Sequence, residues 1–164
     1  MQSKSSPQRA QTPADSFESE HVILIREIAL SDAEAAAQLS AELGYPAEID
    51  EMKKRIALVS SAADRVVYVA QRETVVGWID VSIVHHLGTG TYGEIGGLVV
   101  SAEHRGSGIG RKLVAQGERW VADRGIATMV VRSRITREAA HRFYLREGYT
   151  MTKTSAVFSK TLKS

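Results

Sequence analysis

Residues 98–112 combine a β-branched apolar run, a glycine-containing loop and the start of an amphipathic helix. The segment reads Leu-Val-Val, then Ser-Ala-Glu-His, then Arg-Gly-Ser-Gly-Ile-Gly-Arg-Lys. A strand that passes through such a loop into a helix leaves backbone N–H groups free at the helix N-terminus, where the helix dipole also favours negative charge. The segment therefore predicts a strand–loop–helix unit that binds a phosphate or pyrophosphate group.

Two common phosphate-binding loops do not fit this segment. A Walker A loop ends in Gly-Lys followed by Ser or Thr, whereas Gly110 is followed by Arg111 and Lys112. A dinucleotide-binding fingerprint has two residues between its second and third glycines, and here only Ile109 separates Gly108 from Gly110. A glycine-rich turn that binds no ligand is the remaining alternative.

The rest of the chain alternates between strand-like and helix-like hydrophobic patterns. Strands are expected at residues 21–28, 65–71, 75–84, 92–100, 127–133 and 149–160, with helices at 31–43, 49–59, 108–124 and 136–147 and a loop at 85–91. Ser31 is the expected N-cap of the first helix, with Glu34 completing a capping box. The Gly96-Gly97 pair indicates a bulge or splay in its strand.

This order, β-αα-βββ-α-β-α-β, predicts an α/β fold with a mixed sheet covered by helices. A single domain is expected over residues 21–164. The Ser-, Gln- and Pro-rich residues 1–20 are expected to form a disordered tail.

Composition excludes several classes of protein. The chain has no cysteine, which excludes disulfides, a thiolate nucleophile and cysteine-based metal sites. Its apolar runs are too short to span a bilayer and its N-terminus lacks a signal-peptide layout, so a cytoplasmic protein without membrane contact is expected.

The charge is divided unevenly along the chain. Residues 21–104 carry 6 basic and 12 acidic side chains, whereas residues 105–164 carry 13 basic and 4 acidic ones. This asymmetry favours an anionic partner for the second half and a cationic one for the first, although solvated surface is the simpler alternative.

The loop motif Arg105-x-x-Gly108-x-Gly110 resembles the acetyl-coenzyme A motif of the GNAT superfamily of N-acetyltransferases. Residues 140–149 resemble that family's second signature, a helix carrying Tyr144 ahead of a glycine–aromatic step. Both motifs occur in the family's order and spacing, and the final segment resembles the ends of members that acetylate small-molecule amines. The resemblance implies a GNAT-like domain with a splayed sheet.

The resemblance also implies how acetyl-coenzyme A (acetyl-CoA) is held as cosubstrate. The strand before the loop would pair with the pantetheine arm, a role that falls on Leu98, Val99 and Val100. The loop would hold the pyrophosphate through Arg105, Gly106, Ser107, Gly108, Ile109, Gly110 and Arg111. The family often has an Asn where this chain has Arg134 or Arg137, and Arg137 could instead meet a phosphate.

Acetyl transfer needs a neutral amine, a polarised thioester carbonyl and a proton for the departing thiolate. Tyr144 is the candidate acid, because a phenol with a pKa near 10 stays protonated at neutral pH. The alternative interpretation is that Tyr144 only packs on the face of its helix. Glu94 matches a position where many family members place a base acting directly or through water, and a solvated strand-end glutamate is the alternative. The residues assigned to the acceptor amine are Tyr45, Glu48, Trp78, Asp80 and Tyr92.

The predicted function is acetyl transfer from acetyl-CoA to the primary amine of a small, cationic acceptor. A catalytically silent module that binds acyl-CoA is the main alternative. Nucleic-acid binding is disfavoured because the arginines of the second half lack interleaved aromatics, and a metal at His85-His86 because no further ligand is evident. A homodimer is left open, because the family is often dimeric.

Overall fold

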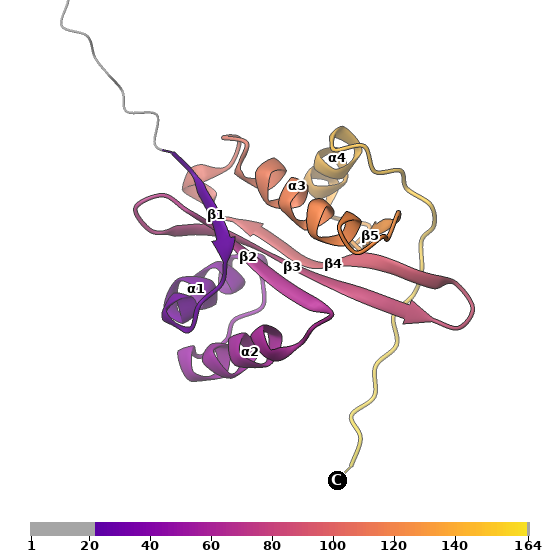
Figure 1. The fold of residues 1–164 in the computed structure, drawn as a ribbon, viewed down its shortest axis with the longest axis horizontal. Helices are drawn as coiled ribbons and strands as arrows, with labels where there is room; N and C mark the ends of the chain where they lie inside the picture. The colour runs from indigo at the N-terminus through magenta and orange to yellow at the C-terminus, as the bar shows by residue number, and fades with distance from the viewer. Residues whose placement is uncertain (1–21, 164) are drawn as a thin grey trace, which may run out of the picture.

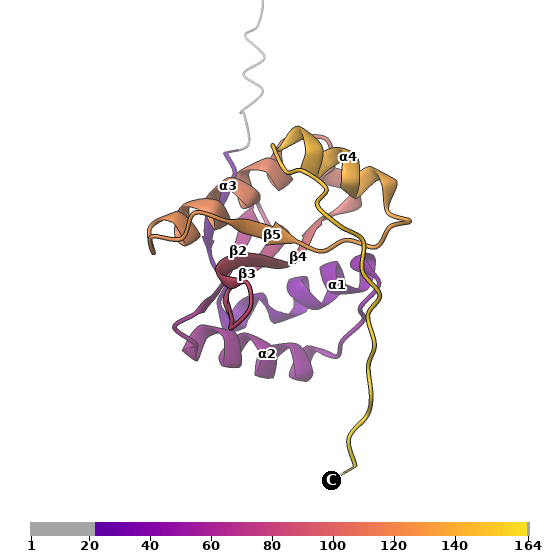
Figure 2. The same cartoon turned by 90° about the vertical axis from the view of Figure 1, so that its right-hand side faces the viewer.

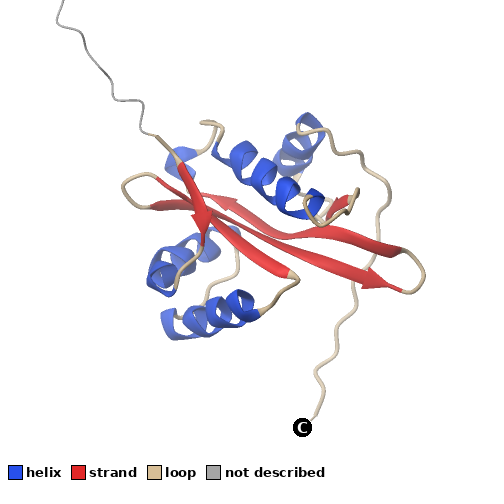
Figure 3. Ribbon diagram, viewed as in Figure 1, coloured by secondary structure: helices blue, strands red, loops and turns tan. Residues whose placement is uncertain are grey.

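A computed structural model describes residues 22–163, so the tail expected at residues 1–20 lies outside the described residues. The strands are β1 (Leu24–Glu27), β2 (Arg65–Gln71), β3 (Val75–His86), β4 (Gly90–Val100) and β5 (Met129–Val131). The α-helices are α1 (Ala33–Leu43), α2 (Ile49–Ser61), α3 (Ile109–Ala122) and α4 (Glu138–Arg146), with 3-10 turns η1 (Leu30–Asp32) and η2 (Ala102–His104). Figure 3 shows these elements by type.

The described strands form one sheet in the order β1-β2-β3-β4-β5. Neighbouring strands are antiparallel except β4 and β5, which run parallel. Helices α1 and α2 cover one face of the sheet, while α3 and α4 lie on the other (Figures 1 and 2). The expected mixed α/β domain is therefore confirmed.

Each face of the sheet has its own apolar cluster. On the α3 face, the largest fully buried side chains are Ile79, Val81, Ile109, Leu113 and Val114. Gly117 lets α3 approach closely, because a Cβ added there would lie 2.9 Å from Val81 Cγ2. On the other face, the small residues of α1 pack against α2 and against the Trp78 indole of β3. This cluster contains Ala33, Ala36, Ala37, Met52, Ile56 and Trp78.

The glycine pair of β4 forms the predicted bulge. Asp80 of β3 pairs with Gly97, but the next residue, Val81, pairs with Ile95, so Gly96 is the extra residue. On its other side β4 pairs with β5 only at residues 93–95. Because the two parallel strands separate beyond the bulge, the edge of residues 96–100 is left without a partner strand among the described residues. This is the splay that the glycines predicted.

Other expectations about local structure were wrong at particular positions. Strand β3 continues to His86 and strand β4 begins at Gly90, so most of the loop expected at 85–91 belongs to the β3–β4 hairpin. Ser31 is not an N-cap, because it lies inside η1. Asp32 provides the polar contact instead: its carboxylate accepts the Ala29 N–H at 2.8 Å and two hydrogen bonds from Arg26, both at 2.8 Å. Arg26 lies six residues before Asp32, so this ion pair joins the end of β1 to the turn η1 that follows it.

The strand expected at 149–160 is not formed within the chain. Residues 150–163 are assigned to no helix or strand and every one of them is exposed. Figure 2 shows this segment leaving α4, passing the β4–β5 side of the sheet and continuing beyond the body. A strand needs a partner edge, and the segment does not meet one among residues 22–163.

Candidate functional site

A cleft of about 960 Å³ opens where β4 and β5 separate. It lies between the end of β4, the glycine loop, the first turn of α3, helix α4 and the end of α1. Its lining includes most of the residues expected to hold a cofactor, namely Leu98, Val99, Val100, Arg105, Gly106, Gly108, Ile109, Gly110, Arg111 and Arg137. Ser107 is not part of the lining, and its hydroxyl donates to the His104 carbonyl within the loop.

The loop presents backbone N–H groups at the start of α3. Gly106 and Gly108 have φ of +78° and +81°, a left-handed conformation that glycine adopts without strain. A Cβ on either residue would have no heavy atom within 4 Å, so both glycines border open space. The first helical hydrogen bond joins the Lys112 N–H to the Gly108 carbonyl, and the preceding N–H groups are available to an anion.

Tyr144 lines the same cleft from α4. Its ring packs edge-to-face against Phe143 and Tyr149, at centroid distances of 5.1 and 5.7 Å. Burial raises the pKa of Tyr144 to about 12, with a smaller opposing effect of the nearby Arg137 charge. The phenol is therefore protonated at neutral pH. The neighbouring Tyr149 hydroxyl donates to Glu118 at 2.8 Å.

Glu94 lies on the sheet face covered by α1 and α2. It pairs with Ser82 across the β3–β4 ladder, on the same face as Trp78 and Asp80 because side chains alternate along a strand. Its carboxylate is 3.4 Å from Nε of Arg132, which follows β5. The Glu94 side chain is 24% exposed, so it is neither buried nor free in solvent.

The second carboxylate of this face also has an arginine partner. Arg65 donates to both carboxylate oxygens of Asp80, at 3.0 and 2.8 Å. Tyr92 is buried, stacks on His86 at 5.7 Å between centroids, and accepts a hydrogen bond of 3.3 Å from Arg132. Glu94 and Asp80 thus each have an arginine partner on this face of the sheet.

Of the remaining predicted residues, Arg137 lines the cleft, whereas Tyr45, Glu48 and Trp78 do not. Tyr45 is exposed, and Arg134 approaches its hydroxyl at 3.5 Å. Glu48 is exposed at the start of α2, and its side chain makes no capping hydrogen bond. Trp78 packs into the α1–α2 cluster. Arg137 lines the cleft but donates to the Leu43 carbonyl at 2.9 Å, which ties the start of α4 to the end of α1.

Sequence reasoning missed several polar groups, of which His104 and Glu42 line the cleft and Arg132 does not. Arg132 joins Glu94 and Tyr92, yet nothing in the sequence separates it from the other arginines of the second half. His104 lines the cleft, and its buried Nδ1 has no hydrogen-bond partner within residues 22–163. Glu42 also lines the cleft, and its carboxylate accepts the Ala102 N–H at 3.1 Å.

The histidine pair has a structural explanation that needs no metal. His85 Nδ1 lies 2.8 Å from the Thr91 hydroxyl, and His86 stacks on Tyr92. Among the described residues, no three metal-ligating side chains come together.

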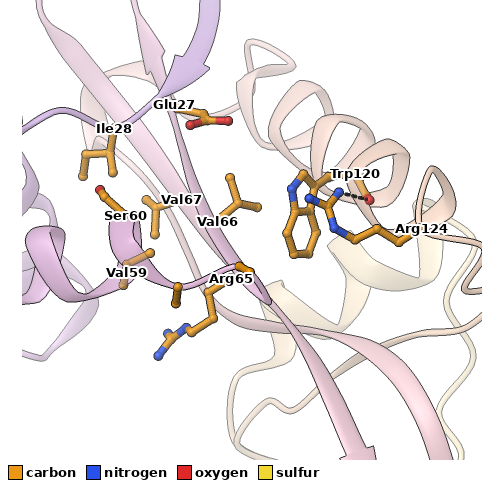
Figure 4. Close-up of a pocket in the computed structure, with 11 residues that line it drawn as sticks. Glu27, Ile28, Val59, Ser60, Arg65, Val66, Val67, Trp120 and Arg124 are labelled. Carbon is orange, nitrogen blue, oxygen red and sulfur yellow. Dashed lines mark hydrogen bonds between the residues drawn. The ribbon is translucent and has the colours of Figure 1, made fainter.

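A second, smaller cavity of about 210 Å³ lies between the end of α2, strand β2 and α3 (Figure 4). The Arg124 guanidinium lies 3.7 Å from the centre of the Trp120 ring and donates to the Trp120 carbonyl at 2.9 Å. The cavity contains none of the residues that the sequence assigned to a cofactor, to catalysis or to an acceptor.

No helix in residues 22–163 is long and apolar enough to cross a membrane.

Together these features define a class of protein: a mixed α/β domain in which one cleft is lined both by a glycine loop at a helix N-terminus and by a half-buried phenol. Comparison with known proteins agrees. The model of the acetyltransferase (GNAT) family matches residues 25–149. The chain therefore belongs to the GNAT family of acetyltransferases, which confirms the resemblance read from its two motifs.

One curated relative is an aminoalkylphosphonate N-acetyltransferase from Salmonella typhimurium (strain LT2). The two sequences are 42% identical over 76 residues, which is 46% of this chain and 49% of the relative. The match thus spans about half the length of that protein.

Solved structures share the fold at lower identity. An aminoglycoside 6'-N-acetyltransferase from Acinetobacter baumannii superposes with a TM-score of 0.76 at 21% identity, covering 87% of this chain and all of the other. A glucosamine-6-phosphate N-acetyltransferase from Arabidopsis thaliana gives 0.70 at 22% identity, covering 87% and 99%. At these identities the likeness concerns the fold, and the acceptor has to be argued from the site.

Proposed function

We propose that this protein transfers an acetyl group from acetyl-CoA to the primary amine of a small acceptor. The observation that carries the proposal is the shared cleft: the anion-binding loop and the Tyr144 phenol, from two separate sequence motifs, line one opening. The GNAT family match supports acetyl-CoA as the donor. When bound, acetyl-CoA supplies an activated acetyl thioester.

The chain offers matching groups for each part of the donor. The unpaired edge of β4 at Leu98, Val99 and Val100 presents backbone groups to the pantetheine amides, as an added strand would. The loop N–H groups at the start of α3 suit a pyrophosphate. The Arg111 side chain is 79% exposed, and its contact with the Glu147 carboxylate is long, at 3.8 Å. Its charge is therefore available to a phosphate.

Two side chains move protons in this proposal. The Tyr144 phenol donates its proton to the departing thiolate, and its raised pKa keeps that proton in place at neutral pH. Glu94 takes the proton lost by the attacking amine, directly or through a water molecule. Arg132 holds the Glu94 carboxylate in position, while Tyr92 shares the same guanidinium.

The acceptor is proposed to enter on the Glu94 side of the sheet. Glu94, Asp80 and Glu48 favour a cationic acceptor, because a carboxylate attracts an ammonium group. A second candidate is an amine that also carries an acidic group. Arg132 and Arg65 favour it, since each adds a cation beside an acid of this face. The curated relative named for aminoalkylphosphonates supports the second candidate.

Thiol release from acetyl-CoA across an amine panel tests both candidates. The panel pairs 2-aminoethylphosphonate with ethylamine, which lacks the acidic group, and includes a polyamine and an aminoglycoside. Preference for the polycations supports the cationic acceptor. Preference for the phosphonate over ethylamine supports the second candidate. Coenzyme A binding without thiol release for any amine would favour the silent binding module.

A further inference from the structure

Arg132 carries a guanidinium whose hydrogen-bonding capacity the protein uses only in part. Its Nε lies 3.4 Å from the Glu94 carboxylate, and its Nη2 donates to the Tyr92 hydroxyl at 3.3 Å. Charge-assisted hydrogen bonds of an arginine are usually about 2.7–2.9 Å long, so both contacts are long. The Arg132 side chain is 55% exposed, and its Nη1 makes no hydrogen bond within residues 22–163. The guanidinium therefore has donors available to a ligand.

Arg132 also lies at the place where the two parallel strands separate. It directly follows Val131, the last residue of β5. Glu94 pairs with Val130, and because side chains alternate along a strand, Arg132 points to the same face of the sheet as Glu94. This is the face covered by α1 and α2, opposite α3 and α4 (Figure 2). Arg132 is thus beside the candidate base, on the side where the acceptor is proposed to enter.

Neighbouring arginines have other partners or belong to the cofactor cleft. Arg65, which pairs with the other acid of this face, donates to both oxygens of Asp80 at 3.0 and 2.8 Å. A ligand at Arg65 would have to displace that carboxylate. The cleft that suits the cofactor is lined by different arginines, among them Arg105 and Arg111, and not by Arg132. The cofactor therefore does not account for the free donors of Arg132.

We propose that Arg132 is a specificity-determining residue that binds an acidic group carried by the acceptor amine. This role of Arg132 rests on the proposed acetyl transfer. The ammonium group of the acceptor meets the Glu94 carboxylate, and its carboxylate or phosphonate meets the Arg132 guanidinium, so each end of the acceptor faces the opposite charge.

The spacing of the two protein groups limits the size of the acceptor. Because Arg132 and Glu94 are only 3.4 Å apart, an amine and an acidic group that contact both are separated by a short spacer of about two or three atoms. The acceptor class is therefore a small amino acid or aminophosphonate, and not a long polycation.

Acetylation kinetics with matched amines separate recognition of the acceptor from positioning of the base. The amines are 2-aminoethylphosphonate, β-alanine and ethylamine, which share a two-carbon chain and differ in the acidic group. In Arg132→Gln, the ratio of kcat/KM for an acid-bearing amine to that for ethylamine should fall by about ten- to a hundredfold, mainly through KM. If Arg132 only positioned Glu94, all three amines would lose activity equally. An unchanged ratio for both acid-bearing amines therefore overturns the proposal.

Arg55→Gln is the matched control for this change. The Arg55 side chain is 53% exposed and its Nε lies 3.3 Å from the Glu51 carboxylate, so its exposure and ion-pair distance are close to those of Arg132. Arg55 is on α2 and lines neither the cleft nor the acceptor region. The control should keep the wild-type ratio. Circular dichroism verifies that both variants are folded.

Isothermal titration calorimetry tests the same contact without turnover. Protein saturated with coenzyme A, which carries no acetyl group, is titrated with each amine. The wild type should bind at least one acid-bearing amine about tenfold or more tighter than ethylamine, and Arg132→Gln should lose this difference. The longer 4-aminobutylphosphonate should bind more weakly than 2-aminoethylphosphonate.

The two measurements also separate this role of Arg132 from the proposed activity. Absence of thiol release with every amine would contradict acetyl transfer, while the titrations would still report what Arg132 binds. A wild type that binds neither acid-bearing amine more tightly than ethylamine, or a difference that survives Arg132→Gln, overturns the role of Arg132 even where acetyl transfer is observed.

Discussion

Gly110, in the first turn of α3, lies directly against the ring of Phe143 in α4. A Cβ added to Gly110 would be 3.3 Å from two atoms of that ring, closer than ordinary van der Waals contact. The two sequence motifs therefore meet at this contact. Since Tyr144 follows Phe143, the contact sets how far the phenol lies from the glycine loop.

Gly110→Ala is expected to displace α4 slightly and lower kcat by about tenfold, because small misplacements of a catalytic group are costly. Coenzyme A should still bind. The double variant Gly110→Ala, Phe143→Leu makes room for the added methyl group and should recover part of the loss. Steady-state kinetics of the wild type, Gly110→Ala, Phe143→Leu and the double variant measure this coupling. Strictly additive effects would show that the contact does not position Tyr144.

Tyr144→Phe removes only the phenolic hydroxyl. We expect kcat to fall by about a hundredfold, as is usual when a general acid is lost, with little change in the KM for acetyl-CoA. Tyr149→Phe is the matched control. It removes the hydroxyl bonded to Glu118 and should lower stability by about 1 kcal/mol without a comparable fall in kcat. Equal kcat values for the two variants would exclude Tyr144 as the acid.

Gly108 and Gly125 separate backbone strain from cofactor binding. Both have positive φ, +81° and +74°, and both face open space. Replacing either by alanine should cost about 1 kcal/mol of unfolding free energy, because a Cβ disfavours this conformation. Only Gly108→Ala should also weaken coenzyme A binding, as measured by isothermal titration calorimetry. Equal affinities for the two variants would mean that the loop does not contact the cofactor.

Asp32 stabilises the start of the α1–α2 region through Arg26. The hydrogen bonds from Arg26 are the main cause that lowers the pKa of Asp32, although burial opposes them. Because the folded-state pKa is the lower one, the stabilisation is complete above the unfolded pKa of about 4 and is lost as the pH falls toward the folded value. Asp32→Asn should therefore cost about 1–3 kcal/mol at neutral pH, and less in acid.

Urea unfolding at several pH values measures the effect of Asp32→Asn. Glu51→Gln is its control, because Glu51 pairs with Arg55 at 3.3 Å on an exposed helix surface. That change should shift the unfolding free energy by less than about 0.5 kcal/mol. A cost for Asp32→Asn that does not change between neutral and acid pH would contradict the role of the ion pair.

Local patterns predicted the parts of the site that are local. The glycine loop and the Tyr144 helix could be read from the sequence because turn conformation and helix periodicity depend on neighbouring residues. The pairing of Glu94 with Arg132 could not, because only the parallel placement of β4 and β5 brings them together. The segment at residues 150–163 shows the same limit. Its composition favours a strand, but whether a strand forms depends on an available edge elsewhere.

The most direct test of the central claim is amine-dependent release of coenzyme A thiol from acetyl-CoA, with the acetylated amine identified by mass spectrometry. The wild type should release thiol with at least one primary amine, and Tyr144→Phe should do so far more slowly while binding coenzyme A equally well. Tight coenzyme A binding with no amine-dependent thiol release for any amine of the panel would contradict the account.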